Sequence, residues 1–340
     1  MRFRVFFWFV LPSVVMMVAF IAAPLVMVFI NSVQVTQPVM EQVEIESCTP
    51  GFSGETCTTS TETRPTLDED GNVITQTRYV GFQSYARLME PAQAFAAVTT
   101  GKIGQFLQID FWGALRFTLT FTLLTLPLIV IVGLSIAISV NNAVQRLRGS
   151  VIFVSLLPFI ITPVIGSLSI YWLFVGDGIL TRAIEGWTGQ DIAVFANGWS
   201  IEVLMLFYRV WHVSPFAFVI FYAALQTVNQ DTLESAIVDG ASRWQRLRYV
   251  IIPHLMPLIV FVALIHLMDA YRVFDEIVGF RAAGYVQSLQ YLTYELMQPD
   301  DAGNRQISRA SASAVLTMIG IVLLLVPLLR RTWREHRGTS

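Results

Sequence analysis

The sequence lacks most of what a soluble protein, an enzyme or a nucleic-acid-binding protein would carry. Only 14% of its 340 residues are charged, against about a quarter in a soluble domain. It has no basic tract interleaved with aromatic residues, which argues against a nucleic-acid partner. It has no Gly-x-x-x-x-Gly-Lys-Ser/Thr phosphate loop, no cluster with metal-ligand spacing and no nucleophile–base motif. An enzyme, a metal site and direct ATP binding are therefore not expected.

Long apolar runs dominate instead, since 54% of the residues are hydrophobic. A helix needs about 20 apolar residues to cross the core of a bilayer, and a membrane-spanning backbone must satisfy its own hydrogen bonds. The first run is too long for the core of a signal peptide. Six runs qualify as transmembrane helices: 5–30, 111–140, 151–175, 201–225, 255–280 and 310–329.

The distribution of charge predicts the orientation of these spans. Cytoplasmic segments of membrane proteins carry an excess of Lys and Arg. Arginines lie at the N-terminus, after the second and fourth spans and in the tail, whereas acidic residues crowd the loop after the first span. Both termini are therefore expected in the cytoplasm.

A polar segment of about 80 residues separates the first two spans and contains the only two cysteines. Two cysteines are too few for a structural zinc site. On an oxidising outer face, Cys48 and Cys57 close a short loop that contains glycine and predict a disulfide. Two free thiols are the alternative. The segment is predicted to be a small extracytoplasmic insert.

The loop between the fourth and fifth spans has a helical pattern of its own. Asp231 and Glu234 predict a capping-box start, and Gly240 predicts a break or tight turn. A second apolar stripe begins at Trp244 and is expected to end at Pro253. The pattern predicts two short helices that cross at Gly240 and expose an apolar face. Such a face needs a partner.

This loop resembles the EAA loop of binding-protein-dependent ABC importer permeases. The spacing of the family pattern "EAA…G…I-LP" is kept at every signature position, from Glu234 through Gly240 to Val250, Ile252 and Pro253, and Ser235 replaces an alanine. Asp239-Gly240-Ala241 is similar to the "DGA" of the maltose-type carbohydrate branch, and Phe274-Asp275 to its "F-D-x-I". The resemblance implies a cytoplasmic coupling helix that docks into an ATPase. The residues implied in this docking are Glu234, Ala236, Asp239, Gly240 and Ala241. Arg243 is a further candidate for contact with an acidic surface of the ATPase, with the positive-inside rule as the alternative explanation of its charge.

The expected fold class is thus all-α integral membrane, with six transmembrane helices, the coupling helix, and the insert between helices 1 and 2. The expected limits are 1–31 for the N-terminus and first helix, 32–110 for the insert, 111–330 for the permease core with coupling loop 229–253, and 331–340 for the tail.

The resemblance implies a permease subunit that translocates a sugar or sugar-like solute, such as a saccharide, polyol or glycerol derivative, across a bacterial inner membrane. The implied partners are a second permease subunit, two copies of a cytoplasmic ATP-binding subunit and an extracytoplasmic solute-binding protein, besides the lipid bilayer. ATP and Mg²⁺ would act on the ATPase, and this chain would bind no cofactor. The insert would contact the solute-binding protein or pack over the bundle.

Polar residues at membrane depth are costly and mark candidate pathways. By resemblance to maltose-type permeases, the sugar-facing positions would be His212, Phe216, His266, Ala270 and Val273. Asp269 joins them as a charge inside the fifth span, with pairing to Arg272 as the alternative.

Two other functions stay open at this point. An ion-coupled secondary transporter would use Asp269 and His266 as its relay. A membrane assembly subunit without transport would use the coupling loop only for docking.

Overall fold

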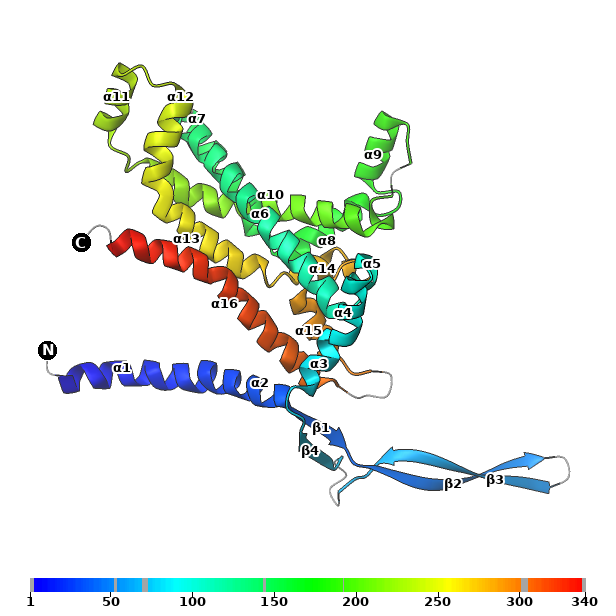
Figure 1. The fold of residues 1–340 in the computed structure, drawn as a ribbon. Coiled ribbons are helices and arrows are strands. Elements are labelled where there is room, and N and C mark those ends of the chain that lie inside the picture. Colours follow the sequence, from blue (N-terminus) through cyan, green and yellow to red (C-terminus); the bar gives the residue numbers. More distant parts are fainter. Residues whose placement is uncertain are drawn as a thin grey trace. The chain divides into compact units, whose positions relative to one another are not determined.

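The computed structural model describes the larger part of the chain, labelled by element in Figure 1. The described residues are 3–51, 54–68, 73–142, 145–191, 193–300 and 305–337. Contacts divide the chain into two units, Met1–Leu88 with Leu296–Val315 and Met89–Glu295 with Leu316–Ser340.

The first unit begins with one long apolar helix. It runs through α1 (Phe3–Met17), a π turn (Val18–Ala22) and α2 (Ala23–Val33). The π turn lies directly before Pro24 in the first turn of α2, and Ala23 donates to the carbonyl of Val18 across it. Because proline lacks an N–H and its ring crowds the carbonyl four residues earlier, the wider turn lets the helix continue through it.

The described residues of the predicted insert form four strands, which the all-α expectation did not include. They form two separate antiparallel ribbons, β1 with β4 and β2 with β3. Cys48 lies opposite Cys57 in the β2–β3 register. The side chains of these cysteines lie outside the described part, so the disulfide stays a prediction. The strand bounds are β1 Gln34–Pro38, β2 Met40–Gly51, β3 Gly54–Pro65 and β4 Thr75–Tyr79.

The other elements among the described residues are helices and short 3₁₀ turns. The shorter ones are α3 (Gln83–Met89), α4 (Pro91–Thr99), α5 (Ile103–Leu107), α9 (Ile179–Thr188), α11 (Gln230–Val238), α12 (Arg243–Arg246), α14 (Asp275–Gly279) and α15 (Leu289–Met297), with 3₁₀ turns at Val194–Ala196 and Ala282–Gly284. The longer ones are α6 (Asp110–Asn141), α7 (Gln145–Ile160), α8 (Pro163–Phe174), α10 (Gly198–Leu225), α13 (Ile252–Ala270) and α16 (Ile307–Arg337).

The described residues confirm the predicted membrane pattern. Five helices are long and apolar enough to cross a membrane, or six if one bent pair counts as a single span. The five are Phe6–Val33, Asp110–Asn141, Gly198–Leu225, Arg243–Ala270 and Ile307–Arg330.

The bent pair, 148–160 with 163–174, is the predicted third span, and it turns by 92°. Prolines inside the run predict a kink or break, and the structure has one at Pro163. Thr162 is extended (φ −64°, ψ 142°) and precedes Pro163. The proline ring disfavours helical backbone in the residue before it, which places the break there.

The limits of the fifth span also differ from the prediction of 255–280. The helix starts at Arg243, passes Pro253 and ends at Ala270. A π turn (Leu247–Ile251) directly before Pro253 absorbs the missing hydrogen bond, as at Pro24. The prediction that Pro253 ends the preceding helix is therefore wrong.

Small residues let α6 and α10 pack closely in the second unit. A Cβ at Gly133 of α6 would lie 2.7 Å from the Cβ of Ala217 and 3.0 Å from the backbone nitrogen of Phe218, both on α10. Such close contact between backbones is the usual way that membrane helices associate. The same two helices contribute Ile129, Ala137 and Phe221 to the buried core.

Gly133→Ala is expected to destabilise the chain by about 1–3 kcal/mol, because overpacking forces the α6 and α10 backbones apart. Gly149→Ala on α7 is the control, since no atom lies within 4 Å of its added Cβ. That variant should be neutral or gain up to about 1 kcal/mol from helix propensity. The unfolding midpoint of the purified chain in detergent measures both. Equal midpoints for the two variants would contradict the close packing.

Candidate functional site

The loop between α10 and α13 begins with a helix cap that the sequence prediction placed incorrectly. Asn229 is the N-cap of α11, and its Oδ1 accepts a hydrogen bond from the backbone N–H of Asp231 at 2.8 Å. The predicted capping box at Asp231 and Glu234 is therefore wrong. Asn and Asp are equally good caps, and Asn229 comes first. A true capping box occurs one helix later, between Ser242 and Gln245.

The turn after α11 confirms the prediction at Gly240. This residue has φ +78°, in the left-handed region that glycine adopts without strain. The N–H of Ala241 donates to the carbonyl of Ala236 at 2.9 Å, and that of Gly240 to Ile237 at 3.0 Å. These two bonds form a Schellman motif, which satisfies the last carbonyls of the helix. The turn sets the direction in which α12 leaves α11.

The loop exposes an apolar face, as predicted. Val238 is 86% exposed, and Ile237, Trp244 and Tyr249 are also exposed. Leu233 instead packs against the helix core and anchors α11. Of the six predicted coupling residues, Ala236 and Ala241 are half-buried and the other four are exposed. Their role in coupling stays a prediction.

The two ends of the loop are joined where α10 ends and α13 begins. Thr227 Oγ1 lies 3.1 Å from His254 Nε2. In Figure 1, α11 projects from the connection between the end of α10 and the start of α13. The loop is therefore tied to both long helices at its base.

A buried ionic cluster, here called the Arg209 cluster, joins α10, the end of α13, and α14. It consists of Arg209, Asp269 and Glu276. Arg209 Nη1 donates to Glu276 Oε1 at 2.5 Å, and Nη2 donates to Asp269 Oδ2. Arg209 is 4% exposed and Glu276 1%, whereas the side chain of Asp269 is 59% exposed.

The alternative pairing of Asp269 with Arg272 does not form. Arg272 Nε donates to the carbonyl of Met268 instead, at 3.3 Å. Arg209 and Glu276 are not among the site residues predicted from the sequence. The signal for Arg209 was present, since it is the only arginine inside the apolar run 201–225.

Most of the predicted sugar-facing residues are buried within the chain. This holds for His212, His266, Ala270 and Val273, while Phe216 is half-buried. Phe216 stacks on Phe159 with ring centroids 5.8 Å apart. The structure therefore gives these side chains protein neighbours, and their contact with a solute stays a prediction.

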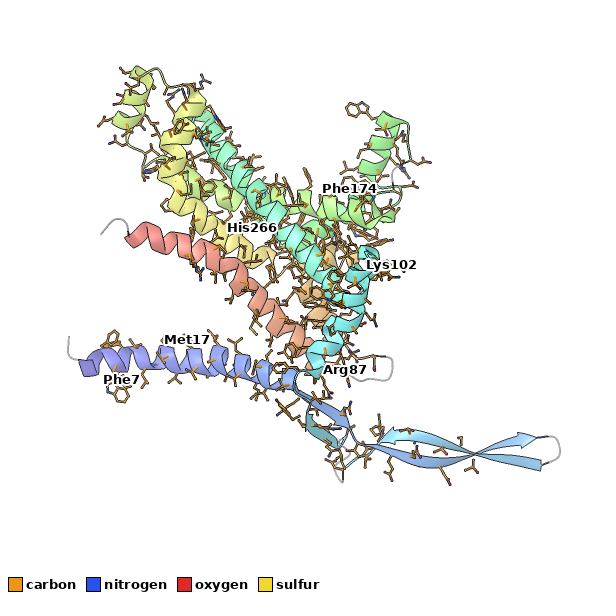
Figure 2. All side chains as sticks on the ribbon, viewed as in Figure 1. Phe7, Met17, Arg87, Lys102, Phe174 and His266 are labelled. Carbon is orange, nitrogen blue, oxygen red and sulfur yellow. The ribbon has the colours of Figure 1, made fainter. Side chains whose placement is uncertain are left out.

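The two histidines have specific hydrogen-bond partners. His266, labelled in Figure 2, has its Nε2 2.9 Å from Thr125 Oγ1 of α6. His212 Nε2 lies 2.8 Å from the carbonyl oxygen of Ile161 at the break of the third span. Because a carbonyl only accepts, this nitrogen carries the hydrogen.

Several buried polar atoms near these groups have no protein partner among the described residues. They are Thr122 Oγ1, Arg209 Nε, His212 Nδ1 and His266 Nδ1. Buried polar groups are normally hydrogen-bonded, so these atoms are unsatisfied in this conformation. No group of three His, Cys, Asp or Glu side chains in the described part could hold a metal ion.

Comparisons with known proteins agree on one family. The model described as "Binding-protein-dependent transport system inner membrane component" matches residues 110–333. The trehalose transport system permease protein SugA of Mycobacterium tuberculosis is 32% identical over 49% of this chain and 53% of its own length. The trehalose/maltose transport system permease protein MalF of Thermococcus litoralis is 24% identical over 74% of this chain and 79% of its own. The match thus spans about half the length of SugA.

A solved structure shares the fold over almost the whole chain. It is a bacterial ABC transporter involved in the import of the acidic polysaccharide alginate. The TM-score is 0.67, with 17% sequence identity, and the alignment covers 98% of this chain and 96% of that one.

Proposed function

The chain belongs to the family of binding-protein-dependent transport system inner membrane components, and we propose that it is the permease subunit of an ATP-driven sugar importer. The observation that carries this proposal is the loop around Gly240. It combines the spacing of the family's coupling loop with an exposed apolar face and joined ends. A permease that receives its energy from a partner needs such a face.

The mechanism proposed for this loop is mechanical. The face of α11 and α12 docks on a separate ATPase, where ATP and Mg²⁺ act. Motion of that partner displaces α11, and Leu233 and the Thr227–His254 contact pass the displacement to α10 and α13. No catalytic group of this chain takes part.

The chain is a multi-pass protein of the inner membrane. The finer proposal is that both termini and the coupling loop lie in the cytoplasm and the insert lies outside. The arginines of the coupling loop and the acidic residues of the insert support this orientation.

A second permease subunit, two ATPase copies and an extracytoplasmic solute-binding protein complete the proposed importer. The relatives are named for single permease proteins of transport systems, which supports a multi-subunit assembly. Lipid and the second permease would cover the apolar side chains that this chain leaves exposed on its spans.

A neutral saccharide is the proposed solute. The relatives are named for trehalose and for trehalose/maltose. Both bonded nitrogens of Arg209 are taken up by carboxylates, and Asp269 stays largely exposed. An anionic solute would meet this carboxylate and be repelled, whereas hydroxyl groups suit the unpartnered atoms of Thr122 and His266.

Family membership favours this proposal over the ion-coupled alternative. Asp269 and His266, the relay of that alternative, each have a structural partner, Arg209 and Thr125 respectively. A transport measurement distinguishes an assembly subunit, because such a subunit would bind an ATPase and import no solute.

Val238→Glu is expected to weaken binding of the ATPase subunit about tenfold or more, since burying a valine contributes about 1.5–3 kcal/mol and a buried, unpaired carboxylate costs further. Co-purification of the ATPase with the permease from membranes measures this. The control is Trp187→Glu on α9, where the side chain is 93% exposed. Equal ATPase recovery from both variants would count against docking through α11.

A further inference from the structure

The break in the third span lies within an apolar run and needs partners for its backbone. Ile161 and Thr162 separate α7 from α8, and Pro163 has no N–H to give. In lipid, a carbonyl that loses its helical partner must find another one. The element whose side chains bond to this backbone therefore fixes the position of the break.

Two side chains of α10 bond the backbone on the two sides of this break, one at Ile161 between the helices and one at Pro163, whose carbonyl also accepts from Ser167 Oγ within α8. His212 Nε2 donates to the carbonyl of Ile161 at 2.8 Å, and Tyr208 Oη donates to that of Pro163 at 3.0 Å. Both side chains are buried. They lie one helical turn apart, and their rings stack with centroids 5.4 Å apart. One face of α10 therefore holds both sides of the break.

The contact between α8 and α10 leaves no space for adjustment. A Cβ at Gly166 of α8 would lie 2.3 Å from Tyr208 Oη. On its other side α8 meets α14, where a Cβ at Gly279 would lie 1.8 Å from Ser167 Oγ. Arg209, next to Tyr208, holds α14 through Glu276. Consecutive residues of α10 thus fasten α8 and α14 together.

The C-terminal end of α10 leads directly into the coupling loop, since α10 ends at Leu225 and α11 begins at Gln230. We propose that Tyr208 and His212 are positioning residues that fasten the broken third span to α10, so that displacement of the coupling loop moves α8 and α14. This proposal rests on the importer function and gives His212 a mechanical role.

The first test measures solute imported per ATP hydrolysed by the complete importer in proteoliposomes. Tyr208→Phe removes only the hydroxyl, and His212→Leu removes the ring donor. Each should lower the ratio about fivefold, and both together about thirtyfold, the loss expected for one and two hydrogen bonds. His212→Gln keeps an N–H donor and should retain a ratio within about twofold of wild type.

The control is Ser214→Ala, which removes a buried hydroxyl of α10 that donates to Val210 within the same helix. Its ratio should equal that of the wild type. A wild-type ratio in the double variant would overturn the proposal. A fall in uptake and in ATP hydrolysis by the same factor would also overturn it, because this indicates a structural role alone. The same holds if His212→Gln does not restore the ratio.

The second test does not depend on transport. Spin labels on Ile165→Cys of α8 and Val219→Cys of α10, both exposed positions, are placed in a chain whose two native cysteines are serine. The distance between the labels should be the same in the nucleotide-free and ATP-trapped complex. The distribution of this distance should broaden when Tyr208→Phe and His212→Leu are added.

A mean distance that changes between the two states, or a distribution that stays narrow in the double variant, would refute the fastening. If the wild-type complex imports nothing, the importer function fails, and the label distances still decide the fastening.

Discussion

Replacement of Arg209 by methionine is expected to remove most of the folded chain from the membrane. Glu276 is 1% exposed and would lose its counter-charge. Breaking a buried ion pair by removing one partner costs about 3–5 kcal/mol, and the total stability of a domain is only about 5–15 kcal/mol. The yield of monodisperse protein after solubilisation, together with its melting temperature, measures the loss.

Two further variants separate buried charge from general disturbance. Arg116→Gln breaks a partly exposed pair with Glu202 and should cost less than about 1 kcal/mol. Adding Glu276→Gln to Arg209→Met removes the unpaired buried charge and should restore much of the yield. If Arg209→Met were as stable as Arg116→Gln, the Arg209 cluster would not be a major contributor to the stability of the fold.

Gly240→Val is expected to lower ATP-driven uptake at least about tenfold while the chain still inserts and folds. A side chain at φ +78° is strained by about 1–2 kcal/mol, and more for a branched one. No atom lies within 4 Å of the added Cβ, so the effect is conformational. The Schellman turn opens and α12 leaves α11 in another direction, which separates the docking face. Uptake and ATPase binding, measured on the same preparation, test this.

Gly189→Val provides the matched control. Gly189 follows α9 with φ +67°, and no atom lies within 4 Å of its added Cβ either. The local strain is therefore similar, but the position is far from the coupling loop in the chain. Uptake close to wild type is expected. A similar loss in both variants would indicate that strain anywhere in the chain, and not the shape of the coupling turn, limits transport.

The membrane spans could be predicted from sequence because their cause is local. Length and apolar content decide whether a helix crosses a bilayer, and the exposed face around Gly240 follows from spacing within some 20 residues. The exact ends of the helices were harder to predict. Asn229 and Asp231 both qualify as caps, and the π turns before Pro24 and Pro253 let helices run through prolines that usually end them.

The contacts between distant residues were the part that local patterns could not supply. Arg209 meets partners 60 and 67 residues away. The third span contains Pro158 and Pro163, and its break falls beside Pro163, where Tyr208 and His212 donate hydrogen bonds to the carbonyls of Pro163 and Ile161. The sequence around Pro163 does not indicate that Tyr208 and His212 would bond to the backbone there. Burial of the predicted sugar-facing residues likewise depends on how α10 and α13 pack.

The central claim is that ATP, acting on a partner through the coupling loop, drives a neutral sugar across the membrane with this chain. Its most direct test is uptake of labelled trehalose and maltose by proteoliposomes that hold the permease pair, the ATPase and the solute-binding protein. ATP is supplied on the ATPase side, with no ion gradient. The account predicts uptake that requires both ATP and the solute-binding protein and is lost with Val238→Glu. Uptake driven by a proton or sodium gradient without ATP, or unaffected by that substitution, would contradict it.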